Sequence, residues 1–123
     1  MHQVLIYIAS ILTCGWGVAH LIATKGVVAA FGDLSADNRR IITMEWIVEG
    51  VALISIAAFV AVVTAIQPGA PEERAVYGVA IISLLALSVV SIFTGFKVGF
   101  LPFKLCPFIF CTSAALIFCG AWP

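Results

Sequence analysis

The chain has 123 residues, enough for one domain, and 63% of them are hydrophobic while only 10% are charged. Because a soluble domain carries about 25% charged residues, this composition excludes a soluble core with a polar shell. Six basic and six acidic residues leave no net positive charge to neutralise phosphates, which argues against nucleic-acid binding. The composition indicates a small multi-pass membrane protein whose partner is the lipid bilayer.

Four stretches reach the roughly 20 apolar residues that a membrane-spanning helix needs. The sequence predicts helices over residues 3–24, 41–66, 75–100 and 104–122, within a single transmembrane domain covering residues 1–123. The first stretch lacks a basic flank and is longer than the apolar part of a signal peptide, so we interpret it as a retained helix. The predicted fold is all-α, a left-handed up-down-up-down four-helix bundle in the membrane.

The connections between the predicted helices carry turn signals. Residues 67–74 (QPGAPEER) stop one helix and start the next, and Pro102 is expected to break the third helix. Residues 25–31 could form a short interfacial helix, because their apolar side chains share one face. Ser35 is a candidate N-cap for the second helix. Pro107 is expected in the first turn of the fourth helix, where a missing N–H costs little.

Basic residues are unevenly distributed over the three connections. Five belong to the first and third connections and one to the second: Lys25, Arg39, Arg40, Lys97 and Lys104, against Arg74. The positive-inside rule therefore predicts that loops 25–40 and 97–104 are cytoplasmic and that both termini lie outside. The same skew argues against insertion in two opposite orientations.

Four ionisable side chains are predicted to lie in the same half of the bilayer. His20 comes about one turn before the cytoplasmic end of the first helix. Glu45 and Glu49 lie about 6 and 12 Å along the second helix from its predicted start, at 1.5 Å per residue. Lys97 approaches the same side at the end of the third helix. We consider this shared depth the strongest functional signal in the sequence.

Glu49 carries most of that signal. An ionised carboxylate within a spanning helix costs several kcal/mol and normally faces a partner or a wet cavity. One interpretation is a site that handles protons, binds a metal or binds a lipid headgroup. The other is a structural pair with His20 or Lys97 that holds the first three helices together.

The neighbouring aromatic residues leave similar alternatives open. Trp16 lies one turn before His20, so the two side chains could line a pocket together. Glu45 lies beside Trp46, and both could anchor the helix in the headgroup region without a further role. Lys97 is expected to reach the interface with its charged end, or else to serve as the counter-ion of Glu49.

Small residues and cysteines indicate close helix packing. The small residues are Gly15 and Gly17 in the first helix and Ser88, Ser91, Gly95 and Gly99 in the third. They predict close approach of helices within the chain or between copies in a homo-oligomer or larger membrane complex. The cysteines are Cys14, Cys106, Cys111 and Cys119. No CxxC motif occurs, so we interpret the cysteines as small apolar packing residues.

The candidate residues say little about a cofactor. One histidine with two glutamates is a weak signal for a metal. Haem is disfavoured, because its second axial ligand would have to be His2, at the opposite end of the helix. A quinone or a lipid fits the apolar surroundings better.

Three segments of the first half resemble the DoxX-like membrane proteins. They are residues 15–21 (GWGVAHL), 31–32 (FG) and 45–53 (EWIVEGVAL). The resemblance implies a four-helix membrane protein, in a family where some members are associated with quinone-linked sulfur oxidation. Small multidrug-resistance transporters are set aside, because they use a glutamate in their first helix and none occurs there in this chain.

Three hypotheses follow, in order of preference. The first is a non-catalytic accessory protein or self-associating bundle that binds a lipid, quinone or other hydrophobic molecule near a buried His/Glu cluster. The second is a component of a membrane redox or metal-dependent enzyme that uses His20, Glu45 and Glu49. The third is a small transporter or channel with Glu49 as its carrier carboxylate.

Overall fold

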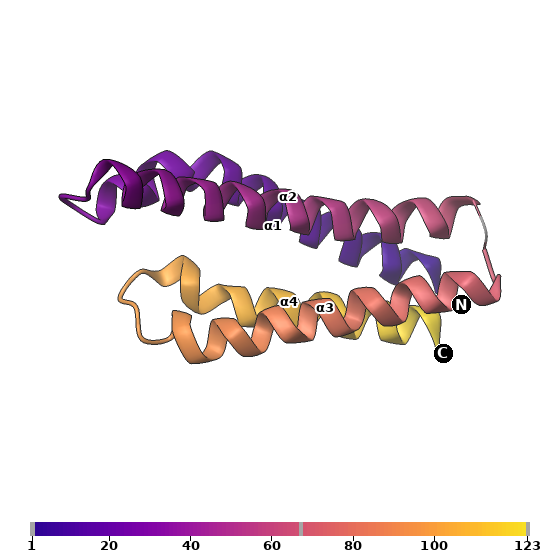
Figure 1. Cartoon of the computed structure of the whole chain (residues 1–123). Coiled ribbons are helices and arrows are strands. Elements are labelled where there is room, and N and C mark those ends of the chain that lie inside the picture. The colour runs from indigo at the N-terminus through magenta and orange to yellow at the C-terminus, as the bar shows by residue number, and fades with distance from the viewer. Residues whose placement is uncertain (1, 67, 123) are drawn as a thin grey trace.

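The computed structural model describes residues 2–66 and 68–122 of the chain. It consists of α1 (Gln3–Ala30), α2 (Ala36–Ile66), α3 (Pro71–Gly95) and α4 (Leu101–Ala121), as Figure 1 shows. Each of the four helices is long and apolar enough to cross a membrane. The prediction of an all-α protein with four helices of membrane-spanning length is therefore confirmed.

The first connection is shorter than the sequence predicts. α1 continues to Ala30, so the expected end near residue 24 and the separate interfacial helix over residues 25–31 are replaced by one unbroken helix. The chain turns at Gly32, which has a positive φ of 74° that glycine adopts without strain. The Ser35 hydroxyl then accepts a hydrogen bond from the Asn38 N–H at 3.2 Å, which confirms the predicted N-cap.

The other helix boundaries also differ from the prediction, and prolines account for the starts of α3 and α4. α3 begins at Pro71 rather than at residue 75, and it ends at Gly95 rather than at residue 100. Pro102 lies in the first turn of α4, so it starts that helix rather than breaking α3. Proline suits this position, because the first amides of a helix have no partner within the helix. Pro107 consequently lies inside α4 and not in its first turn.

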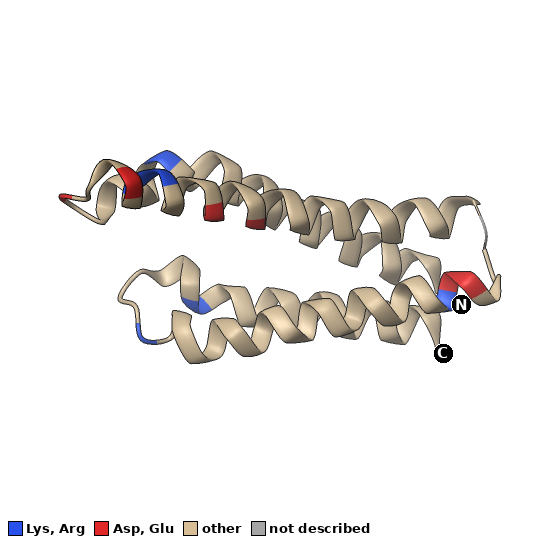
Figure 2. Ribbon diagram, viewed as in Figure 1, with Lys and Arg blue, Asp and Glu red and all other residues tan. Residues whose placement is uncertain are grey.

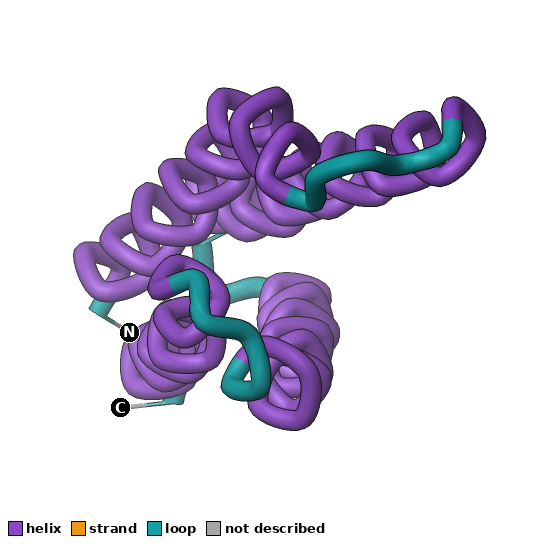
Figure 3. The backbone as a smooth tube through the Cα atoms, turned by 90° about the vertical axis from the view of Figure 1, so that its left-hand side faces the viewer, coloured by secondary structure: helices purple, strands orange, loops and turns teal. Residues whose placement is uncertain are grey.

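The helices form two pairs. α1 packs most extensively on α2, and α3 packs on α4; α1 also contacts α4, and the contact between α2 and α3 is the smallest of these four. Figure 1 shows both termini at one end of the molecule, where the His2 N–H donates to the Gly120 carbonyl at 2.9 Å. Loops 31–35 and 96–100 lie at the other end, and Figure 3, viewed from that end, shows the two pairs as separate layers.

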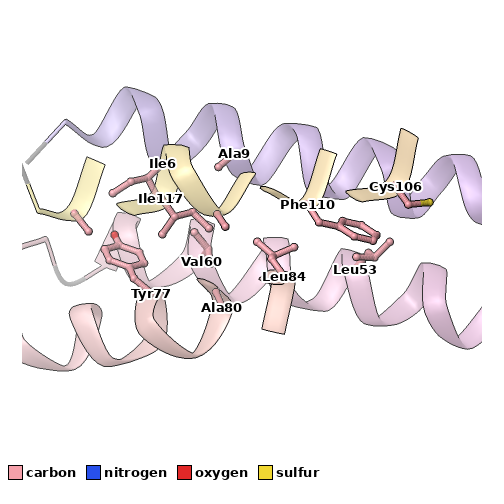
Figure 4. Close-up of a cluster of buried hydrophobic side chains, with 12 residues drawn as sticks. Ile6, Ala9, Leu53, Val60, Tyr77, Ala80, Leu84, Cys106, Phe110 and Ile117 are labelled. Atoms are coloured by element: carbon pink, nitrogen blue, oxygen red, sulfur yellow. The ribbon is translucent and has the colours of Figure 1, made fainter. Parts of the chain in front are cut away.

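The core is built from apolar side chains of all four helices (Figure 4). Leu53, Leu84 and Phe110, from α2, α3 and α4, are fully buried at its centre. The outer surface is also apolar, with side chains such as Ile22 and Phe59 more than two-thirds exposed. An apolar exterior of this extent is typical of a surface in contact with lipid.

Two glycines allow unusually close contacts between helices. A Cβ atom on Gly17 would lie 2.7 Å from the Gly50 carbonyl oxygen, so α1 and α2 meet backbone to backbone. A Cβ atom on Gly95 would lie 2.7 Å from the Phe103 carbonyl oxygen of α4. Proline has no N–H, so Pro107 cannot donate the usual helical hydrogen bond to that carbonyl. Gly95 thus lets α3 approach α4 closely at the Phe103 carbonyl, which lacks its usual helical hydrogen bond.

Charged residues lie toward the two ends of the molecule, and Figure 2 shows an uncharged middle. Arg74 is near the end that carries the termini, whereas the other five basic residues lie toward the end that carries loops 31–35 and 96–100. The distribution matches the charge skew that the sequence analysis uses for orientation. Glu45 and Glu49 are the charged residues closest to the uncharged middle on α2.

Candidate functional site

His20 is the polar centre of the candidate site. Its side chain is only 5% exposed, and both ring nitrogens face protein atoms. Nδ1 lies 2.9 Å from the Trp16 carbonyl oxygen one turn earlier on α1. A carbonyl can only accept, so Nδ1 carries a hydrogen and donates it. Nε2 lies 3.5 Å from Oε1 of Glu49 on α2, which joins the two helices.

The hydrogen on Nδ1 determines how His20 can interact with Glu49. With Nδ1 protonated, a neutral His20 presents only a lone pair at Nε2, which would repel an ionised Glu49. The contact is attractive when one further proton is shared between Nε2 and Oε1, either on the imidazole or on the carboxyl. The Glu49 side chain is 38% exposed, whereas His20 is buried.

Aromatic rings continue outward from His20. Trp16 meets the imidazole edge-on at 5.7 Å, and Trp46 stacks on it at 4.9 Å with an interplanar angle of 26°. Trp46 in turn meets Phe103 edge-on at 5.5 Å, and Phe103 meets Phe100 at 5.7 Å. Edge-to-face and offset contacts at these distances are favourable for aromatic pairs. The series connects α1, α2 and the start of α4.

These rings surround a cavity of about 160 Å³. Its walls come from α1, α2, α4 and the loop before α4: Trp16, Ala19, His20, Ala23, Trp46, Phe100, Pro102, Phe103 and Cys106. Both nitrogens of His20 are engaged elsewhere, so the cavity presents mainly ring faces and methyl groups. Such a surface can hold an apolar ring by stacking and shape, and it offers few hydrogen bonds.

The structure brings together only some of the predicted site residues. Trp16, His20 and Trp46 line the cavity. Glu49 contacts Nε2 of His20 but does not line the cavity itself. Glu45 is exposed and forms no ion pair or side-chain hydrogen bond within residues 2–66 and 68–122. Lys97 is exposed in the loop between α3 and α4, and in the same described part of the chain it forms no ion pair with Glu49.

Only some of the predicted small residues bring helices close together. Gly17 and Gly95 make the close helix contacts described above, and Ser88 is buried and donates to the Pro107 carbonyl at 3.2 Å. Ser91 donates within its own helix, to Leu87 at 2.8 Å. For Gly15 and Gly99, a Cβ atom would meet nothing within 4 Å, so neither brings helices together within one chain.

The cysteines do not form a pair. All four are free, and Cys106 is buried at the cavity, while the Cys111 sulfur lies 3.1 Å from the Ser88 hydroxyl. In the described residues, no group of three His, Cys, Asp or Glu side chains is arranged to hold a metal ion. Cys106 lines the aromatic cavity, whereas the sequence predicted only a packing role for it.

A second polar cluster lies at the opposite end of the molecule, where the sequence analysis expected only a turn. Glu73, in the first turn of α3, is fully buried. One carboxyl oxygen accepts the Gly69 N–H at 2.6 Å, and the other accepts the Tyr77 hydroxyl. Tyr77 also contacts the Thr64 hydroxyl of α2 at 2.6 Å. This cluster fixes the end of α2 against the start of α3, two helices that have few other contacts with each other.

Spacing could have indicated the second cluster. Glu73 and Tyr77 are four residues apart, which places them on one face of a helix that starts at Pro71. With the third helix predicted to start at residue 75, Glu73 is expected in the turn. The first turn of α3 is instead helical, because Pro71 suits its first position and acidic residues favour a helix N-terminus.

Comparison of the chain with protein-family models, with curated proteins and with solved structures finds no match. The similarity of residues 15–21 and 45–53 to DoxX-like proteins therefore stays a prediction from the sequence. The chemistry of the site has to be argued from its own geometry.

Proposed function

We propose that the protein is a multi-pass membrane protein that binds one ring of a hydrophobic small molecule, such as a quinone or a ring-bearing lipid. The binding site is the aromatic cavity beside His20, and the protein itself carries out no chemical step on the ligand. This is the first hypothesis of the sequence analysis. The observation that carries it is the wall of aromatic rings around the cavity.

The size of the cavity supports this proposal. An apolar cavity of about 150 Å³ in a well-packed protein stays dry and binds benzene. The cavity beside His20 has about the same volume, 160 Å³, and its walls are richer in aromatic rings. One six-membered ring therefore fits, and the remainder of a larger ligand would extend into the lipid along the apolar outer surface.

The His20–Glu49 pair supports a binding role over a catalytic one. Nδ1 and Nε2 both face protein atoms, so neither nitrogen is free to act as a base toward a molecule in the cavity. The pair instead fixes the imidazole as a rigid wall on which Trp46 stacks.

We also propose that the helices cross the membrane as an up-down-up-down bundle with loops 31–35 and 96–100 in the cytoplasm. Five basic residues near those loops, against Arg74 near the other end, support this orientation. Labelling of single introduced cysteines with a membrane-impermeant maleimide tests it, in a variant whose four native cysteines are replaced by alanine. A cysteine at Asn38 should react only after the cells are opened, and one at the exposed Glu72 should react in intact cells. The reverse pattern would contradict the orientation.

Native mass spectrometry of the detergent-purified protein, with an absorption spectrum of the same sample, tests the binding role. We expect a retained small molecule in the wild-type protein and its loss in Ala23→Leu, which fills the cavity. The matched control is Ala52→Leu, the same change on the exposed face of α2, outside the cavity. Equal retention in both variants would contradict the proposal, and so would a stoichiometric metal in place of an organic molecule.

A further inference from the structure

A second hollow lies between α1 and α2, near the end that carries loop 31–35. It is an open groove of about 560 Å³ that shares no residue with the aromatic cavity. One face of each helix lines it, at spacings of three, four and eight residues: Leu21, Thr24, Lys25, Val28 and Ala29 from α1, and Arg39, Thr43 and Ile47 from α2. We call it the basic groove.

The groove has positive charge without a matching negative one. Lys25 and Arg39 come from opposite walls, and no acidic residue is among the lining. Neither side chain forms an ion pair within the described parts of the chain, whereas the neighbouring Arg40 lies 3.4 Å from Asp37. Two cations facing one groove repel each other, and an anion bound between them would relieve that repulsion.

The position of the groove fits the boundary between the hydrocarbon core and the headgroups. α1 has 28 residues and α2 has 31. At 1.5 Å per residue these helices are about 42 and 46 Å long, against a hydrocarbon core of about 30 Å. Figure 1 shows that the α1–α2 pair extends past α3 and α4 at the loop 31–35 end. In Figure 2 the basic segments of both helices lie next to this extension, level with the loop between α3 and α4.

The chemistry of the groove changes along its length. Leu21 and Ile47 lie further from loop 31–35 than Lys25 and Arg39 do, toward the middle of the helices. The groove is therefore apolar toward the centre of the membrane and cationic toward the water. A ligand that complements it has an anionic group joined to a hydrocarbon chain.

We propose that the basic groove binds the headgroup of an anionic phospholipid of the cytoplasmic leaflet, with the phosphate between Lys25 and Arg39 and an acyl chain along Leu21 and Ile47. The cytoplasmic leaflet is the one rich in anionic lipids, and basic pockets between membrane helices bind such headgroups. This inference uses the proposed orientation of the helices, and it is independent of the aromatic cavity.

Native mass spectrometry from nanodiscs made of equal parts phosphatidylglycerol and phosphatidylcholine tests this site. We expect the wild-type protein to retain phosphatidylglycerol in preference to phosphatidylcholine. Each lost cation should weaken this preference about fivefold, so Lys25→Gln with Arg39→Gln should reduce it about 25-fold. Ala29→Trp, which fills the groove and leaves its charges in place, should also abolish the preference.

The matched control removes the same charge from the same end of the molecule. Lys97→Gln with Lys104→Gln deletes one cation of the other loop and one of the first turn of α4, both outside the groove, and should leave the preference within about twofold. Lys25→Arg keeps the charge and should retain the lipid. This variant shows that a changed side chain at residue 25 does not by itself disturb the fold. If the two double variants lose the lipid preference equally, the lipid is attracted by the overall positive charge of this end and not by a specific site, which would contradict the proposal. If millimolar inorganic phosphate displaces the lipid, the ligand of the groove is a free anion and not a lipid, which would also contradict the proposal.

Discussion

Gly17→Ala is the substitution that should most clearly separate helix packing from the rest of the structure. The added Cβ atom would lie 2.7 Å from the Gly50 carbonyl oxygen and 2.9 Å from Cγ1 of Ile54. The backbone oxygen cannot rotate away, so α1 and α2 have to separate by about 0.7 Å to reach ordinary contact at about 3.4 Å. Glu49 directly precedes Gly50, so the same movement acts on the ion pair.

The magnitude follows from these distances. Forcing one methyl group into a well-packed contact costs about 1–3 kcal/mol of unfolding free energy, and the higher helix propensity of alanine offsets up to about 1 kcal/mol of this loss. The His20 Nε2 to Glu49 Oε1 distance of 3.5 Å would lengthen to about 4 Å, the limit of an ion pair. Gly15→Ala is the control, because a Cβ atom at Gly15 meets nothing within 4 Å. Alanine favours a helix over glycine by about 1 kcal/mol, so Gly15→Ala should not destabilise the protein.

Two measurements check this prediction. Thermal unfolding in detergent, followed by circular dichroism, should rank Gly15→Ala at or above the wild-type protein and Gly17→Ala below it. Nitrogen-15 NMR of histidine side chains reports the pair directly, because the chain contains only His2 and His20. The His20 signal should shift in Gly17→Ala alone. Equal stability and equal spectra for the two variants would refute the close contact between α1 and α2.

Three further substitutions, at two positions, test the polar contacts of His20 and Glu73. Glu49→Ala leaves the buried Nε2 of His20 without a partner and should cost about 1–3 kcal/mol, whereas Glu49→Gln can donate an amide hydrogen to Nε2 and should cost less than 1 kcal/mol. Tyr77→Phe removes the hydroxyl between Glu73 and Thr64, and the fully buried carboxyl then loses a donor, so a similar loss of about 1–3 kcal/mol is expected. Chemical unfolding in mixed detergent measures both effects.

Tyr7→Phe is the control for Tyr77→Phe, because the Tyr7 side chain is 37% exposed and is not part of the buried cluster. Comparable losses for the two tyrosines would show that the cluster does not stabilise the junction of α2 and α3. For Glu49, a loss with glutamine as large as with alanine would show that His20 needs the carboxyl itself.

The sequence was sufficient to predict the four helices and one side of the site. Helix length and rise alone place His20 and Glu49 at the same depth, and Trp16 and Trp46 follow from their spacing to these residues. Depth is set by position along a helix, which the sequence determines directly. The direction in which a side chain points depends on the neighbouring helix, and Glu45 and Lys97 accordingly lie apart from the pair.

The remaining half of the cavity could not be predicted. Phe100, Phe103 and Cys106 reach it because α4 begins at Leu101 and packs against α1, and no pattern in the sequence specifies which helices become neighbours. The helix boundaries matter as well. Ending α3 at Gly95 moves Phe100 from a helix into a loop, where it can turn toward Phe103.

The most direct test of the central claim is a titration of tryptophan fluorescence with 4-bromophenol, whose bromine atom quenches an indole ring in contact with it. Trp16 and Trp46 line the cavity. We predict saturable quenching in the wild-type protein and in Ala52→Leu, and none that saturates in the cavity-filling variant Ala23→Leu. The same linear quenching in all three proteins would mean that the probe only partitions into the detergent, and would contradict a ring-binding cavity beside His20.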